Sequence, residues 1–339
     1  MTITAHAPPS APPPRGATPR QLTPGLEPTD RIFEGVSTAV GASVLVVTGS
    51  IGIFLGLQSI PTLRHYGLHF FTQSQWNPEL DKIGIAGVLL GTFEVAMVAM
   101  VVAFPFALAF ALFISDYSPK WLKGWLVSAI DLMAAVPSII YGVWGFALLR
   151  PHASNFARWL SQHFGWVPIF HVNTDPNAAV WQQSQYSSSA FIAGLAVSMM
   201  AIPLACAVMR AVFDQAPHGE REAAMALGGT RWGVVKTVVL PFGKGGIIGG
   251  TMLALGRALG ETAAVLIILS QAYELSPRIL QSGAQTTSAL IAGDFGDATR
   301  SQLSALLTAG FVLFLITLIV NTSAALFIGR SRSGAATEI

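Results

Sequence analysis

An arginine and a glutamate stand four residues apart in a stretch that is otherwise almost entirely apolar. Arg257 and Glu261 lie within residues 245–270, which are rich in Gly, Ala, Leu and Ile. In a helix that begins at Gly245, Arg257 lies about 18 Å along the axis, close to the middle of a bilayer, because each residue adds about 1.5 Å. A charge at that depth usually faces other helices or a water-filled path and has a partner. At the i,i+4 spacing, Glu261 is within its reach.

The residue types leave two interpretations of this pair open. In the first, the two charges form an internal salt bridge that fixes helix packing. In the second, Arg257 holds an anion that crosses the membrane, and Glu261 orients the arginine or competes for it. A guanidinium fits the second role because its planar fork of donors matches a tetrahedral oxyanion with two hydrogen bonds, and because it stays charged.

A second distinctive stretch spans residues 214–244. Residues 220–227 are good helix formers with acidic residues in the first turn, and Gly228-Gly229 is a natural stop. This pattern predicts a short amphipathic helix that lies on the membrane surface. Physical chemistry alone favours a plain interfacial connector.

Both stretches belong to a chain with the composition of a membrane protein. Of its 339 residues, 52% are hydrophobic and 11% are charged, and the mean hydropathy is +0.58. A soluble domain carries about 25% charged residues. The net charge of +2 is too small to predict nucleic-acid binding.

Six apolar segments are each long enough to cross a hydrocarbon core about 30 Å thick, which takes about 20 helical residues. Because lipid offers the backbone no hydrogen-bonding partner, these segments must be helices, and the fold class is an all-α integral membrane bundle. Small residues four apart, such as Gly246 and Gly250, favour close helix packing. The predicted spans are approximately residues 36–57, 85–114, 125–149, 190–210, 245–270 and 303–328.

Both ends of the chain are predicted to be cytoplasmic. Residues 1–30 hold eight of the 20 prolines and no apolar run, which predicts a disordered tail without a cleavable signal peptide; residues 331–339 form a second tail. With both tails inside, basic residues are twice as frequent inside as outside, as the positive-inside rule requires. The inside set is Arg15, Arg20, Arg31, Lys120, Lys123, Arg210, Arg221, Arg231, Lys236, Lys244, Arg330 and Arg332, against Arg64, Lys82, Arg150, Arg158, Arg278 and Arg300 outside.

The loop 214–244 also resembles a known signature. Glu222-Ala223-Ala224 is followed after three residues by Gly228 and, after nine more, by Val238, one residue and Leu240-Pro241. This spacing resembles the EAA signature of ABC importer permeases, with Val in place of the usual Ile.

That resemblance implies a coupling helix that docks in a groove on a cytoplasmic ATPase. Glu222 would contact the nucleotide-binding subunit, and Ala223 and Ala224 would pack in the groove. Gly228 would make the turn, and Leu240 and Pro241 would return the chain to the membrane.

The stretch around Arg257 is similar to a second family pattern. Residues 255–262 read L-G-R-A-L-G-E-T, which resembles the G-R-A-[LI]-G-E-T stretch of permeases in the phosphate-specific ABC importer. With Trp76-Asn77-Pro78 before the second span, the chain resembles the PstC type of permease. The PstA type more often continues with A-P, where this chain has Ala263-Ala264. The resemblance covers roughly residues 31–330, implies a type I ABC importer permease fold, and favours the anion-binding interpretation of Arg257.

The same resemblance implies partners and a location. The importer would combine this chain with a PstA-type permease, two copies of a PstB-type ATPase and an extracytoplasmic PstS-type phosphate-binding protein, in the cell membrane of a prokaryote. ATP and Mg²⁺ would be used by the ATPase. The chain itself lacks a G-x-x-x-x-G-K-[ST] phosphate-binding loop, so we expect a transport subunit that is not an enzyme and binds no cofactor.

Two other functions remain open from the residues. An anion channel or an ion-coupled phosphate carrier would use Arg257 and Glu261 without needing the loop 214–244, and a related permease could carry another oxyanion. Glu94 is expected to have a structural role or to contact the second permease. Pro105 and Pro137 are candidate kinks. His152, His163 and His171 lack the spacing of metal ligands, and no metal site is predicted.

Overall fold

The computed structural model describes residues 28–173, 184–270 and 276–329. Most of the predicted N-terminal tail (1–30) and the predicted C-terminal tail (331–339) therefore lie outside the described residues. Within the described part the chain is almost entirely helical, in agreement with the predicted all-α class.

Helices dominate the order of elements along the chain, and one short pair of strands interrupts them near the N-terminal end. The elements are α1 (Pro28–Tyr66), α2 (His69–Thr72), β1 (Trp76–Asn77), η1 (Pro78–Leu80), β2 (Lys82–Ile83), α3 (Ala86–Leu112), η2 (Phe113–Tyr117), α4 (Lys120–Ala135), α5 (Ser138–Trp144), η3 (Gly145–Leu149), α6 (Arg150–Phe164), η4 (Pro168–Phe170), α7 (Ser184–Ser187), α8 (Ala190–Phe213), α9 (His218–Ala226), α10 (Arg231–Val234), η5 (Val235–Val239), α11 (Leu240–Phe242), α12 (Lys244–Leu259), α13 (Ala263–Ile268), α14 (Thr287–Asp294) and α15 (Arg300–Gly329).

The chain divides into two compact units, residues 1–51 and 52–339. The described residues of the first unit form the N-terminal part of α1. The second unit contains the rest of α1 and all other elements. In this second unit the end of α1 packs against α15: the Thr62 and Ser304 hydroxyl oxygens lie 2.8 Å apart, and the small Gly52 leaves room for the ring of Phe314.

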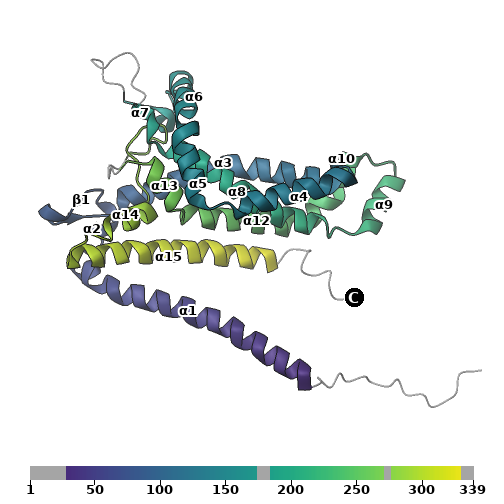
Figure 1. Cartoon of the computed structure of the whole chain (residues 1–339), viewed down its shortest axis with the longest axis horizontal. Coiled ribbons are helices and arrows are strands. Elements are labelled where there is room, and N and C mark those ends of the chain that lie inside the picture. The colour runs from purple at the N-terminus through teal and green to yellow at the C-terminus, as the bar shows by residue number, and fades with distance from the viewer. Residues whose placement is uncertain (1–27, 174–183, 271–275, 330–339) are drawn as a thin grey trace, which may run out of the picture. The chain divides into compact units, whose positions relative to one another are not determined.

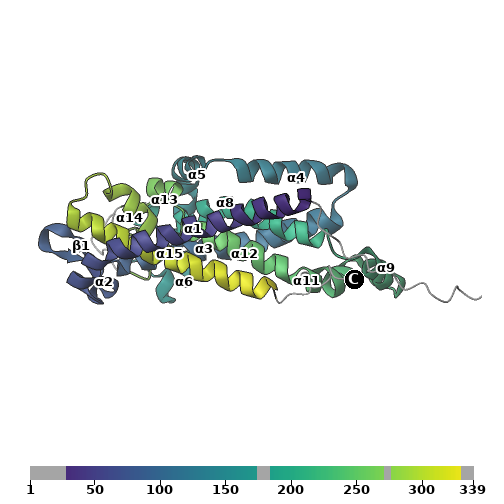
Figure 2. The same cartoon turned by 90° about the horizontal axis from the view of Figure 1, so that it is seen from below.

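Four helices in the described residues are long and apolar enough to cross a membrane: Thr29–Tyr66, Ala86–Tyr117, Ala190–Phe213 and Arg300–Phe327. Two bent pairs raise this number to six if each counts as one span. The helices Lys120–Ala135 and Ser138–Phe164 meet at 90°, and Arg231–Phe242 and Lys244–Leu259 meet at 68°. Pro137, a predicted kink, stands at the first bend, and Figure 2 shows α4 running along one side of the helices to meet α5 there.

Helix α8 is the centre of the second unit and packs against α3, α4 and α12. Small residues permit the closest approaches, as expected for membrane helices. A Cβ added at Gly246 of α12 would lie 2.6 Å from Val212 of α8, and one added at Gly142 of α5 would lie 2.6 Å from Cα of Ala264 in α13. The predicted packing role of Gly246 is thus confirmed by its contact with α8.

A short hairpin follows α2. Strands β1 and β2 pair antiparallel, with Trp76 opposite Ile83. Asp81 in its turn has a left-handed backbone (φ 54°) and accepts hydrogen bonds from the hydroxyl of Tyr66 and from Nε2 of His65, the latter at 2.9 Å. Figure 1 shows β1, α2 and α14 at one end of the second unit, and α9 and α10 at the opposite end.

Candidate functional site

The helix that carries Arg257 ends two residues after it. Helix α12 stops at Leu259, and α13 begins at Ala263, so Glu261 lies in the break between them. The continuous helix predicted over 245–270 is therefore interrupted. Glu261 is buried, with 8% of its surface exposed, and one oxygen of its carboxylate accepts a hydrogen bond from the backbone N–H of Ala264 at 3.1 Å. The glutamate thus satisfies an open amide in the first turn of α13.

Arg257 lies in the last turn of α12 and is exposed. Because the helix ends before Glu261, the i,i+4 geometry that the sequence predicted is absent. Among the described residues, no carboxylate oxygen lies within 4.0 Å of the Arg257 guanidinium. Arg257 is consequently a cation without an ion-pair partner in the described part of the chain.

A buried polar segment also packs at the break between α12 and α13. The sequence analysis did not include it in the candidate site. Gln285, Thr286, Thr287 and Ser288 are all buried at the start of α14. The Ser288 hydroxyl donates to the backbone oxygen of Glu261 at 2.6 Å. The Thr92 hydroxyl accepts from the backbone N–H of Thr287 at 3.0 Å, which ties α14 to α3. Four consecutive polar residues, Gln285 to Ser288, were the signal for this segment, which the sequence analysis assigned to the outside loop between the fifth and sixth spans.

The short helix predicted in the loop 214–244 is present as α9, residues His218–Ala226, against a predicted 220–227. Glu222 and Ala223 are exposed, and Ala224 is half-buried. Gly228 has a φ of 85°, a left-handed conformation that favours glycine, and its N–H bonds to the oxygen of Met225 at 2.9 Å. The structure thus confirms that the helix stops at the predicted glycine.

The remaining residues of the EAA pattern lie in the return segment. Leu240 and Pro241 form α11, which follows the π-helical turn η5 and leads through Gly243 into α12. Leu240 is half-buried and Pro241 is exposed. The pattern therefore occupies one continuous excursion from the end of α8 to the start of α12.

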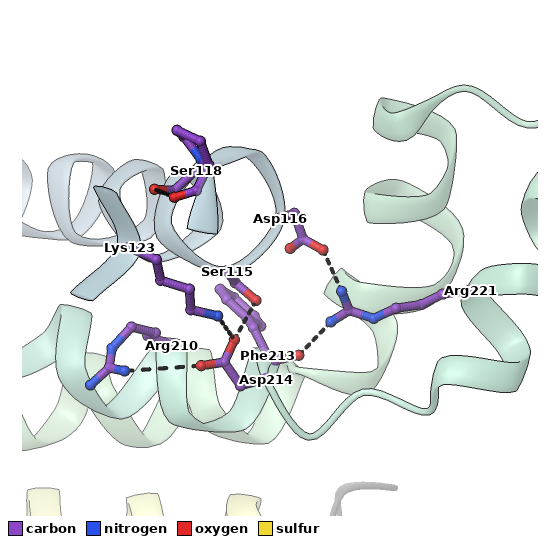
Figure 3. A network of polar contacts seen from close by, with 9 residues as sticks. Ser115, Asp116, Ser118, Lys123, Arg210, Phe213, Asp214 and Arg221 are labelled. Carbon is purple, nitrogen blue, oxygen red and sulfur yellow. Dashed lines mark hydrogen bonds and ion pairs between the residues drawn. The ribbon is translucent and has the colours of Figure 1, made fainter. Parts of the chain in front are cut away.

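The loop also exposes large apolar side chains that the sequence-based interpretation did not single out. The exposed fractions are 53% for Met225, 90% for Leu227 and 56% for Trp232. A further residue that it missed is Arg221. As Figure 3 shows, Arg221 points toward Asp116 and the end of α8.

Two large cavities lie elsewhere. One of about 550 Å³ is lined by residues of α3, α4, α5 and α8, and the other of about 620 Å³ by residues of α3, α6 and α8 together with Glu94. Neither is lined by Arg257 or Glu261, and nearly all of their lining side chains are apolar. Such walls do not stabilise a bare anion, so the candidate anion contact remains at the exposed Arg257.

Comparisons with known proteins agree with these features. Residues 103–333 match the model of a family described as the binding-protein-dependent transport system inner membrane component. The chain is 37% identical to the phosphate transport system permease protein PstC of Xylella fastidiosa strain Temecula1 over 302 residues, which cover 89% of this chain and 91% of that protein. It is 35% identical to the phosphate transport system permease protein PstC 2 of Mycobacterium tuberculosis, with coverage of 90% and 93%.

A solved structure shares the fold. In the crystal structure of a bacterial alginate ABC transporter in complex with an alginate pentasaccharide-bound periplasmic protein, one chain superposes with a TM-score of 0.57 at 16% sequence identity. The match covers 89% of this chain and 95% of that chain. At this identity the likeness concerns the fold of the membrane subunit alone.

Proposed function

The chain belongs to the binding-protein-dependent family of inner membrane transport components, and we propose that it is a permease subunit of an ATP-driven importer of inorganic phosphate. The observation that carries this proposal is the match, over about nine tenths of both chains, to proteins named as phosphate transport permeases. Three features of the chain support the proposal further: the apolar helices, the exposed loop helix α9, and the exposed Arg257 near the middle of the predicted span 245–270.

In this proposal the chain crosses the cell membrane of a prokaryote six times, with both ends in the cytoplasm. Each of the two bent helix pairs counts as one span. The twofold excess of Lys and Arg in the regions assigned to the inside supports this orientation. It puts α9 in the cytoplasm, and the β1–β2 hairpin and α14 on the outer side.

Arg257 is the proposed phosphate contact. Its guanidinium has no ion-pair partner among the described residues, so the internal salt bridge with Glu261 loses its support. An unpaired cation near mid-membrane is stabilised when an anion enters the path, and the guanidinium fork offers phosphate two parallel hydrogen bonds. Glu261 would act indirectly, by holding the start of α13 in place.

Helix α9 is the proposed docking element for a separate ATPase. Its exposed face presents Glu222 and Ala223 next to the apolar side chains of Met225 and Leu227. An exposed apolar surface with a charged residue at its edge is typical of a site where a second protein binds. The exposed Gly228 lets the chain turn back sharply beside this patch.

The complete importer would need a second, PstA-type permease, two copies of a PstB-type ATPase that use ATP and Mg²⁺, and an extracytoplasmic PstS-type phosphate-binding protein. ATP-driven closure of the ATPases would displace α9 and turn the path toward the outside. Phosphate from the binding protein would then reach Arg257, and hydrolysis would reset the path. This chain would bind no cofactor.

Phosphate uptake into proteoliposomes tests the proposal. The chain is purified with its partners, and uptake is measured with and without ATP and the binding protein, with sulfate and molybdate as competitors. We expect uptake that requires both ATP and the binding protein and that neither competitor inhibits. Uptake by this chain alone without ATP would indicate a channel or carrier, and inhibition by sulfate or molybdate would indicate a permease for another oxyanion.

A further inference from the structure

Arg221 joins the loop helix α9 to two other elements at once. Its Nη1 donates to Oδ1 of Asp116 in η2, the turn that continues α3, at 2.5 Å. Its Nη2 donates to the backbone oxygen of Phe213, the last residue of α8, at 2.6 Å. Figure 3 shows the guanidinium between these two acceptors. One side chain thus links α9 with the ends of α3 and α8.

A second carboxylate extends this network to α4. Oδ1 of Asp214 accepts hydrogen bonds from Nζ of Lys123 at 2.9 Å and from the Ser115 hydroxyl at 3.0 Å. Its Oδ2 lies 3.9 Å from Nη1 of Arg210. Asp214 therefore holds the end of α8 against η2 and the first turn of α4, directly beside the link made by Arg221 (Figure 3).

The Arg221–Asp116 pair is shielded from water. The exposed fractions of the two side chains are 17% and 10%, whereas the other ion pairs of the network are more open. Exposed pairs contribute little, but removing one member of a buried pair leaves an uncompensated charge. Within the described part of the chain, Oδ2 of Asp116 and Nε of Arg221 are buried and have no hydrogen-bond partner, so these two atoms make no contact that would compensate for the loss of the pair.

Helix α9 has no other firm attachment of this kind. None of its nine residues, all of which the structure describes, is buried. It packs against α10 and η5 of the same loop, and the ion pair together with the hydrogen bond to Phe213 links it to the ends of α3 and α8. Helix α8 in turn packs closely against α12, the helix of Arg257, where Gly246 meets Val212.

We propose that Arg221 is a positioning residue that transmits displacement of α9 to the ends of α3 and α8, and through α8 to α12. The proposal rests on the proposed function, in which a partner ATPase moves α9. Because the Arg221 side chain binds both η2 and the end of α8, these two elements and α9 would move as one body. Without it, α9 could move while α3 and α8 stay in place.

The test compares Arg221→Ala with Arg231→Ala, an exposed arginine in the same loop, in the full complex with both permeases, the ATPase and the binding protein. Three quantities are measured: ATPase copurification, ATP hydrolysis and phosphate imported per ATP. We expect Arg221→Ala to keep copurification and hydrolysis but to lower the phosphate imported per ATP by about 5- to 150-fold, the usual range for coupled sites. Arg231→Ala should match the wild type in all three.

Two results would overturn this role. An unchanged amount of phosphate per ATP would mean that α9 transmits its displacement without Arg221. A parallel loss of copurification and uptake would mean that Arg221 only maintains the fold of the loop. Arg221→Lys should be intermediate, because an ammonium keeps the charge opposite Asp116 but lacks the fork that also reaches Phe213.

Hydrogen exchange in the isolated chain tests the link made by Arg221 independently of the proposed phosphate import. Arg221→Ala should speed exchange of the α9 amides, and the reversed pair Asp116→Arg with Arg221→Asp should restore part of the protection. Unchanged exchange in Arg221→Ala would refute the link even if the wild-type complex imports phosphate. A wild-type complex that fails to import phosphate would refute the proposed function, whereas faster exchange would still support the link.

Discussion

The loop network around Arg221 and the break around Glu261 hold charged residues in opposite ways. In the network, Asp116 and Asp214 each face basic side chains from other elements. In the break, Glu261 is held by a backbone amide and by the Ser288 hydroxyl, and Arg257 has no acidic neighbour among the described residues. Opposite charges fasten helices together in the first region, whereas the second leaves one cation available.

In the proposed orientation the two regions lie at different depths in the membrane, and this would account for the difference. Near the water interface, side chains can form ion pairs with a modest loss of hydration. Near the middle of the membrane a charge is expensive to dehydrate, and the hydrogen bond from Ala264 to the Glu261 carboxylate satisfies a backbone amide that the broken helix leaves open. The proposed function assigns a ligand to the unpaired Arg257, and substitutions in each region can test this contrast.

Replacing the lone cation should have the largest effect. We expect Arg257→Ala to reduce phosphate uptake by about 10- to 150-fold, because a hydrogen bond to a charged group contributes about 1.5–3 kcal/mol. Arg257→Lys should recover little, since lysine lacks the planar fork. Lys244→Ala, at the other end of α12, is the matched control and should keep normal uptake. Uptake at the wild-type level in Arg257→Ala would remove the contrast, because Arg257 would then have no ligand to bind.

Crowding the break should destabilise the protein itself. A Cβ at position 142 would lie 2.6 Å from Cα of Ala264, so Gly142→Ala must push α5 away from α13. We expect a loss of about 1–3 kcal/mol, as for other overpacked sites, seen as a lower thermal midpoint in detergent. Gly124→Ala in α4 is the control, because no atom lies within 4 Å of the added Cβ. Equal midpoints for the two variants would show that α5 and α13 can separate freely.

Reversing a charge on the docking face should act on assembly alone. Because Glu222 is exposed, Glu222→Lys should leave the chain folded but weaken copurification of the ATPase by about tenfold, or about 1.4 kcal/mol. Glu220→Lys, in the same helix and also exposed, should change copurification much less. If both variants retain the ATPase equally well, Glu222 does not lie at the docking surface.

The smallest effect is expected at the exposed pair of the β1–β2 hairpin. The hydrogen bond from Tyr66, followed by that from His65, lowers the pKa of Asp81. A lowered pKa in the folded state means that the stabilisation is complete above the unfolded-state pKa of about 3.9 and disappears as the pH falls through the folded-state value. We expect the Gly84 amide, which bonds to Gln75 in this hairpin, to exchange faster only below about pH 4.

Substitution of Asp81 gives the same small change at neutral pH. Asp81→Asn keeps a residue that tolerates the left-handed backbone but removes the charge, so the exchange of Gly84 should rise by at most about threefold, as for exposed pairs. Glu79→Gln, an exposed neighbour, should have no effect. A large loss of protection in Asp81→Asn would show that exposed pairs matter here as much as the partly buried Arg221–Asp116 pair.

Local features of the sequence predicted the loop helix well. Helix formers followed by Gly228-Gly229 set both the position of α9 and its end, because capping and backbone conformation depend on neighbouring residues. The long apolar helices also followed from composition, since a stretch of about 20 apolar residues suffices to identify one.

The break and the network required distant partners and could not be predicted. Residues 245–270 carry no charge except at Arg257 and Glu261, so the pattern indicated a single helix. The break depends on Ser288, 27 residues further along, and on the contact of Glu261 with α13. Likewise, Arg221 meets Asp116 across 105 residues of chain. Such contacts depend on how the helices pack, which the spacing of residues in one segment does not specify.

The lack of buried residues in α9 has a consequence for how the protein is made. A nine-residue segment is too short to hold a helix in water by itself, and α9 gains little from apolar packing. It should therefore become helical only after the ends of α3 and α8 have met and Arg221 can bind both. A newly inserted chain with misplaced helices would then present no ordered α9 to an ATPase, so that recruitment of the partner would select correctly assembled membrane subunits.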